Sequence, residues 1–256
     1  VVGAAYASVA GRLVAAGLAF AWLARRRHVL SLRAVPPPAV ALPVARPLLA
    51  DAWPLSLQIG LRAALVVALT VVVQRRFGDA ATAALGIATR LDTLILFASL
   101  GFANAATVYA GRAVVVARPG LARAAGLWAA FAAGLFGLGM LLGMQGLAAA
   151  IVGWFLPGAP GEVLAVMRLY LDTVGWSQVL GAVAFGAIGA VHGAGRMVAP
   201  LVVDLLGFGV VFAWFGLVVF GAGDLAAVFA SLVGGMGCVA VLHLGFVGIG
   251  RWPLLR

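Results

Sequence analysis

The chain has 256 residues, of which 65% are hydrophobic and only 9% are charged. Because soluble domains carry about a quarter charged residues, this composition excludes a soluble globular protein and predicts an integral membrane protein. The net charge is +10, and the chain contains arginine but no lysine. The arginines fall between apolar runs instead of on one basic face, which argues against nucleic acid as a partner.

Sequence patterns typical of enzymes and metal sites are missing. The chain has no H-E-x-x-H and no G-x-S-x-G motif, and the glycine-rich residues 221–226 lie between two apolar runs with no strand before them. His28, His192 and His243 are scattered without metal-ligand spacing, and the lone Cys238 has no disulfide partner. We therefore expect no enzyme activity, no catalytic residue, no metal and no cofactor.

Seven apolar stretches are long enough to cross a membrane as helices, which takes about 20 residues. They cover residues 1–24, 52–73, 80–108, 122–155, 163–191, 197–220 and 225–249. The first is not a signal peptide, because its positive cluster at Arg25, Arg26 and Arg27 follows the apolar run instead of preceding it. The prediction is an all-α integral membrane protein with about seven transmembrane helices.

Residues 25–50 form the one long connection and hold five prolines. Proline stiffens a chain and prevents helix, so we expect a semi-rigid linker between a single helix over 1–24 and a six-helix lobe over 51–256. The chain begins at valine, which suggests a piece of a longer or processed protein whose first helix ends a preceding lobe. Arginines near the connections mark the cytoplasmic side and place the linker and the C-terminus in the cytoplasm of an inner-membrane protein.

Three charged residues lie near the middle of the predicted spans. Arg62 is in the second span, and Arg90 and Asp92 are in the third. Residues two apart on a helix point to nearly opposite faces, so Asp92 shares a face with Ser99 and not with Arg90. Asp92 either forms an ion pair with Arg62 across two antiparallel neighbours, or faces a cavity, where an unpaired carboxylate can carry a proton.

Three other polar residues in the spans are candidates for a cavity or for coupling. Asp172 lies four residues after Arg168, a spacing typical of a local salt bridge. Gln178 is a candidate lining residue, and Asn104 is a candidate for a hydrogen bond between helices. Polar groups inside a membrane need such partners or water.

Glycine pairs four residues apart occur within the spans, at Gly139 and Gly143 and at Gly189 and Gly193. Small residues at this spacing let two helix backbones approach closely. We expect these pairs to serve helix packing.

Four segments of the chain form a recognisable series: "WPLSLQIGLRAALVVAL", "FGDAATAALGIATRLDTLILFASLGFANAATVYAGR", "ARPGLARA" and "GAIGAVHGAGRMVAPLVVDLLGFGVV". Together they resemble the multidrug and toxic compound extrusion (MATE) family. In their order and spacing they are similar to the C-terminal half of these transporters over residues 47–250. The resemblance implies that residues 1–24 correspond to the sixth of twelve helices, that 25–50 connect two lobes, and that the last six helices form a MATE-like C-terminal lobe.

The resemblance also implies a function. Members of the family export drugs and organic cations in exchange for protons or sodium, by alternating access between two lobes. The expected partners are therefore membrane lipid, a small organic cation and an N-terminal lobe of the same transporter, with Arg62, Arg90 and Asp92 lining or bracing the cavity. Many sodium-coupled members carry a glutamate near the position of Arg62, and an arginine cannot bind sodium, so proton coupling is favoured.

Two alternatives remain, one within transport and one from a different functional class. A related flippase would move a lipid-linked headgroup, since arginine side chains pair bidentately with phosphate; Arg62 and Arg90 both facing a cavity would favour it. The second alternative is a membrane scaffold, or a degenerate half, that transports nothing.

Overall fold

The computed structural model describes residues 2–25, 38–221 and 223–249, and these residues form eight helices and no strand. Helices satisfy every backbone hydrogen bond within one segment, which the hydrocarbon of a bilayer requires. The predicted fold class, an all-α integral membrane protein, is confirmed. The chain divides into two units, Val1–Ala50 and Asp51–Arg256.

The first unit contains α1 (Val2–Arg25) and the first turns of α2 (Pro38–Val115). The described apolar stretch of α1 is Val9–Ala21, which is shorter than a membrane span. The prediction that proline excludes helix from the linker is wrong for residues 38–50, which are helical. Pro38 lies in the first turn, where its missing N–H costs no helical hydrogen bond. The part of the linker at 26–37 lies outside the described residues.

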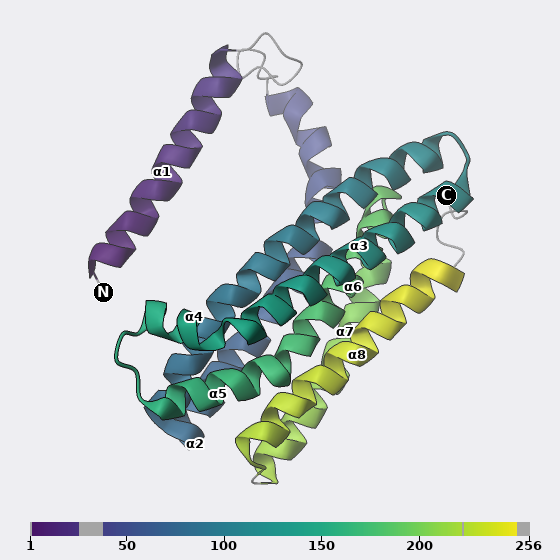
Figure 1. Ribbon diagram of the computed structural model, residues 1–256. Helices are drawn as coiled ribbons and strands as arrows, with labels where there is room; N and C mark the ends of the chain where they lie inside the picture. Colours follow the sequence, from purple (N-terminus) through teal and green to yellow (C-terminus); the bar gives the residue numbers. More distant parts are fainter. Residues whose placement is uncertain (1, 26–37, 222, 250–256) are drawn as a thin grey trace. The chain divides into compact units, whose positions relative to one another are not determined.

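In the second unit, α2 consists of two helical arms that meet at Gly78. Gly78 has φ 78° and ψ −165°, a backbone conformation open to glycine, and the chain doubles back there (Figure 1). The Gln74 side chain donates to the Asp79 carboxylate at 2.9 Å, and Arg76 donates to the carbonyl of Val219 at 2.7 Å. The two arms contain the predicted second and third spans as antiparallel neighbours.

The next two predicted spans are each broken in two. The span expected over 122–155 consists of α3 (Pro119–Gly146) and α4 (Ala148–Phe155), separated at Leu147. The span expected over 163–191 consists of α5 (Gly161–Asp172) and α6 (Val174–Gly193), separated at Thr173. At Thr173 the backbone stays in the right-handed helical region but departs from ideal helical angles, with φ −111° and ψ −78°. Hydropathy sums over a whole window, so it does not detect a break at one residue.

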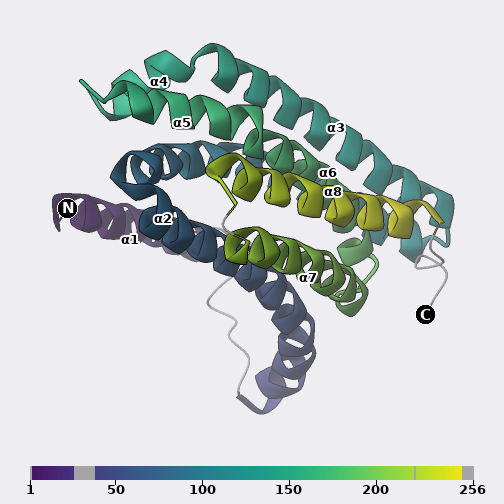
Figure 2. The same cartoon turned by 90° about the horizontal axis from the view of Figure 1, so that it is seen from below.

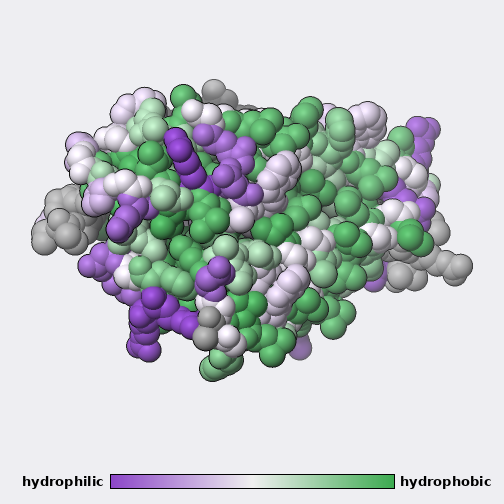
Figure 3. All heavy atoms as spheres, turned by 60° about the horizontal axis from the view of Figure 1, so that its bottom comes forward, coloured by the Kyte–Doolittle hydropathy of each residue, from purple (hydrophilic) through white to green (hydrophobic). Residues whose placement is uncertain are grey.

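The second unit ends with α7 (Val198–Phe220) and α8 (Leu225–Ile249). Figures 1 and 2 show α3, α6 and α8 running side by side, with α7 against α8. Five helical stretches of the described residues are long and apolar enough to cross a membrane, namely Ala45–Val115, Pro119–Gly146, Gly161–Gly193, Val198–Phe220 and Leu225–Ile249. On the face in Figure 3, hydrophobic residues spread over the middle and hydrophilic ones gather mostly toward the sides.

Glycines of α6 bring its backbone against the second arm of α2. A Cβ added at Gly189 would lie 2.2 Å from the carbonyl oxygen of Ala103, and one at Gly193 would lie 2.1 Å from that of Thr107. The Thr107 hydroxyl also donates to the carbonyl of Gly189 at 2.8 Å. The packing role predicted for this pair is confirmed. The packing role predicted for the other pair, Gly139 and Gly143, is wrong, because a Cβ added at either residue would have nothing within 4 Å.

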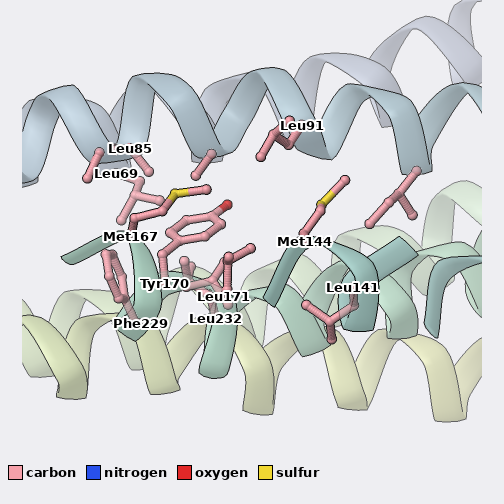
Figure 4. Packing of buried hydrophobic residues seen from close by; sticks show 14 of the residues in the cluster. Leu69, Leu85, Leu91, Leu141, Met144, Met167, Tyr170, Leu171, Phe229 and Leu232 are labelled. Carbon is pink, nitrogen blue, oxygen red and sulfur yellow. The ribbon is translucent and has the colours of Figure 1, made fainter. Parts of the chain in front are cut away.

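Tyr170 of α5 is among the largest fully buried side chains of the core. Its ring packs edge-on against Phe229, with ring centroids 5.4 Å apart. In Figure 4 its hydroxyl oxygen points toward α2, away from the apolar side chains that hold the ring. The core thereby fixes one polar group of the candidate site.

Candidate functional site: a polar cavity in the second unit

A cavity of about 490 Å³ lies between the two arms of α2 and the helices α5, α6, α7 and α8. Most of its lining is apolar, as is usual for small-molecule sites. Its polar lining residues are Arg62, Thr89, Arg90, Asp92, Thr93, Ser99, Tyr170, Ser177 and Gln178. The cavity therefore brings together four of the six predicted site residues.

Among the described residues that line the cavity, Asp92 is the one that is acidic. Its Oδ2 atom accepts hydrogen bonds from the Tyr170 hydroxyl at 2.5 Å and from the Gln178 amide nitrogen at 3.0 Å. Both donors are uncharged in their ordinary states. Asp92 is thus held by neutral groups from a different part of the chain, with Oδ1 not occupied by these bonds.

The break at Thr173 positions both donors. Tyr170 lies on α5 just before the break, and Gln178 lies on α6 just after it. Thr173 lies about 18 Å from the start of α5 at 1.5 Å per residue, which is deep within a span. Membrane transporters build their binding sites around such broken helices near the middle of the bilayer.

Arg62 and Asp92 are not among the ion pairs of the described residues, so the first of the two alternatives, an ion pair between them, is wrong. The guanidinium carbon of Arg62 lies 3.8 Å from the centroid of the Phe185 ring and 5.5 Å from that of Phe208. A guanidinium over an aromatic face is stabilised by the ring quadrupole. The two rings therefore hold the Arg62 head at the cavity wall, where Asp204 also acts on it electrostatically.

Arg90 lines the cavity together with Asp92, although their positions two apart predicted opposite faces. The side chain is largely exposed, and its guanidinium carbon lies 5.9 Å from the centroid of the Phe155 ring of α4. A long flexible side chain can reach around its helix, which a count of helical angles does not capture. Arg90 therefore lies at the edge of the cavity.

Two predicted site residues lie away from the cavity. Asp172 is exposed and accepts a hydrogen bond from Gln145 at 3.2 Å; the expected pair with Arg168 is not among the ion pairs of the described residues. Asn104 is exposed, and it makes none of the hydrogen bonds found between described helices. The predicted bridging role of Asn104 is wrong, because its face of α2 does not meet another described helix.

Sequence reasoning missed several parts of the site. Tyr170 appeared as one more apolar residue of a span, and nothing marked Phe185 or Phe208 as a support for Arg62. The sequence did place a tyrosine two helical turns before Gln178, which could have suggested that both residues belong to one polar site. The sequence did not show the break between them.

A buried pair on α7 and α8 was also missed. The Oδ1 of Asp204 lies 3.5 Å from the Nε2 of His243, and each side chain is only 1% exposed. The sequence indicated that the histidines were scattered, because it could not show that α7 and α8 pack together. Among the described residues, no three His, Cys, Asp or Glu side chains are grouped so as to hold a metal ion.

These features define a class of protein. Several helices are long enough to cross a membrane, one span is interrupted at Thr173, and the ionisable residue Asp92 lines a cavity deep within the spans. These features are typical of a multi-pass membrane transporter. Residues 54–218 match the model of the MatE family, and the chain belongs to that family. No curated protein and no solved structure matches the chain. The protein is accordingly a membrane transport protein of the MATE type.

Proposed function

We propose that this chain forms the C-terminal lobe of an antiporter that exports drugs or organic cations in exchange for protons. One observation carries the proposal, the Asp92 carboxylate that lines the cavity and is held by Tyr170 and Gln178 without an ion pair. Ionisable side chains inside a membrane are costly and mark ion and proton pathways. Asp92 is the group in the cavity able to exchange a proton for a cation.

Protonation of Asp92 gives a means of coupling. A carboxylate accepts hydrogen bonds from both Tyr170 and Gln178, whereas a protonated carboxyl group carries a donor of its own. The proton therefore changes the contacts between α2 and the helices on both sides of the Thr173 break. A ligand that favours one set of contacts shifts the population of states.

Proton coupling is preferred over sodium coupling in this proposal. Among the described residues, the cavity lining contains one carboxylate, at Asp92, and two guanidinium groups, at Arg62 and Arg90. Sodium requires several oxygen ligands and is repelled by positive charge. Exposure of the cavity to the two sides of the membrane in turn requires a second bundle to move against this one, and an N-terminal lobe of the same transporter is the proposed partner.

The size and lining of the cavity support a small organic substrate. Its volume of about 490 Å³ lies within the range of known small-molecule sites. The aromatic ring of Phe185 and the carboxylate of Asp92 offer an organic cation a stacking surface and a countercharge. Proton and substrate then compete for the same carboxylate.

The test is proton-driven efflux of a fluorescent organic cation from proteoliposomes that contain the full-length protein. We expect Asp92→Asn to abolish efflux, because an amide cannot exchange a proton, and to keep the fold, because it still accepts a hydrogen bond. Asp172→Asn is the matched control, since Asp172 lies outside the cavity, and should transport like the wild type. Equal efflux by the Asp92→Asn protein and the wild type would refute the role of Asp92.

A second candidate function is favoured by the two arginines. Arg62 and Arg90 both line the cavity, and guanidinium groups bind phosphate well. A flippase for a lipid-linked phosphate substrate is therefore the rival proposal. It predicts that inorganic pyrophosphate binds to the purified protein and that Arg62→Gln weakens this binding, whereas the cation antiporter predicts no such binding.

A further inference from the structure

The buried pair on α7 and α8 requires a proton. His243 places its Nδ1 atom 2.8 Å from the carbonyl oxygen of Val239, one turn earlier on α8. A carbonyl oxygen only accepts hydrogen bonds, so Nδ1 carries the hydrogen. In neutral His243 the other ring nitrogen, Nε2, is then a lone-pair acceptor.

This Nε2 acceptor faces another acceptor. The Oδ1 atom of Asp204 lies 3.5 Å away, and neither atom has a hydrogen-bond partner. Two lone pairs facing each other in a buried site repel, and each buried acceptor left without a donor is destabilising. One proton between Asp204 and His243 removes both penalties, whether it resides on the nitrogen or on the oxygen.

Asp204 and His243 both lie well inside membrane-spanning helices. Asp204 lies six residues after the start of α7, and His243 lies six residues before the end of α8. Each is therefore about 9 Å from a helix end, well inside a span, where a polar side chain without a role is costly. Neither residue lines the cavity described above.

Arg62 lines the cavity and also interacts with this pair. Asp204 and His243 both act on it electrostatically. The Arg62 guanidinium also stacks against the ring of Phe208, which lies one turn after Asp204 on α7. Both Arg62 and Phe208 line the cavity. His243 also acts electrostatically on His192 of α6, another titratable group near the pair. With one proton the pair is neutral overall, and without it the pair carries one negative charge that attracts Arg62.

We propose that Asp204 and His243 form a proton-binding site that holds one proton between Oδ1 and Nε2, and that Arg62 links the charge of this site to the cavity. Loss of the proton to water leaves one negative charge on the pair. That charge draws the Arg62 guanidinium toward α7 and away from the Phe185 ring. The inference goes beyond the proposed function, because it concerns a second titratable site whose proton can be measured without any transport.

The experiment is nuclear magnetic resonance of the full-length protein in nanodiscs, with nitrogen-15 in histidine and carbon-13 in aspartate carboxyl groups. We expect the His243 Nε2 signal and the Asp204 carboxyl signal to change with pH at one common midpoint, because a shared proton belongs to both groups. His192→Asn is the matched control, since it changes a neighbour and leaves the pair intact, and it should keep the common transition.

Asp204→Asn provides the second arm of the test. The Asn amide can donate to Nε2 in place of the proton, so we expect this variant to fold and His243 to keep one neutral Nδ1–H form at every pH. His243→Leu leaves the carboxylate without its partner and should lower thermal stability more than Asp204→Asn does. The proposal is overturned if either wild-type signal stays unchanged with pH, or if His243 titrates alike in wild type and Asp204→Asn.

Discussion

At the scale of single residues, the candidate site depends on one phenol group. The Tyr170 hydroxyl donates to Asp92, and the ring is fixed by Phe229 in the core. A hydrogen bond to a charged group contributes about 1.5–3 kcal/mol. Tyr170 therefore both orients the carboxylate and ties α5 to α2.

The variant Tyr170→Phe tests this contact. It keeps the buried ring and removes the hydroxyl donor, so we expect transport to fall by about tenfold, which corresponds to about 1.4 kcal/mol. The measurement is the initial rate of substrate efflux, with the folded fraction checked by gel filtration in detergent.

Tyr109→Phe is the control for the same chemical change, because Tyr109 is exposed on α2 and lies outside the cavity. Transport by Tyr170→Phe at the rate of the Tyr109→Phe control would show that the hydroxyl has no part in the cycle.

At the scale of helices, α6 packs closely against two neighbours in the second unit, α2 and α3. Its glycines let it approach the backbones of both neighbours, since a Cβ at Gly189 would meet Ala103 of α2 and a Cβ at Gly186 would lie 2.5 Å from the carbonyl oxygen of Ala129 of α3. Close backbone approach replaces the hydrophobic effect as the source of packing energy between helices in lipid. The same helix lines the cavity through residues such as Gln178 and Phe185.

The variant Gly189→Ala tests this packing. The added methyl would overlap the Ala103 carbonyl, and overpacking of this kind costs about 1–3 kcal/mol. We expect a lower midpoint of thermal unfolding in detergent, followed by the fluorescence of the tryptophans.

Gly139→Ala, on α3, is the matched control because its methyl enters open space. It should leave the midpoint unchanged or raise it slightly, since alanine is favoured over glycine in a helix by about 1 kcal/mol. Equal loss of stability in the two variants would show that helix propensity and not close packing explains the effect.

At the scale of the whole molecule, arginine distribution predicts how the chain crosses the membrane. The turn between α3 and the second arm of α2 contains Arg118, and Arg112 lies in the last turn of that arm. The connection between α4 and α5 contains no arginine and is followed by Glu162. The positive-inside rule therefore puts these two connections on opposite sides, with Arg118 in the cytoplasm.

Cysteine labelling tests this orientation in a protein whose native Cys238 is replaced by serine. Val116→Cys and Pro157→Cys place single thiols at exposed positions of the two connections. We expect a membrane-impermeant maleimide to label Pro157→Cys in intact cells, and to label Val116→Cys only after the membrane is opened. Labelling of Val116→Cys in intact cells would reverse the orientation.

The sequence alone determined the fold class, because membrane crossing requires long apolar helices and such runs are visible in any window of about 20 residues. It also singled out Asp92 and Arg62, since charges are rare in such runs. Apolar length does not encode where a helix breaks or which residues are adjacent between helices. The break at Thr173, the hydrogen bonds from Tyr170 and Gln178 to Asp92, the aromatic support of Arg62 and the Asp204–His243 pair were therefore decided by tertiary packing alone. Helices in lipid rotate to satisfy close backbone contacts and polar partners, and both depend on neighbours far apart in sequence.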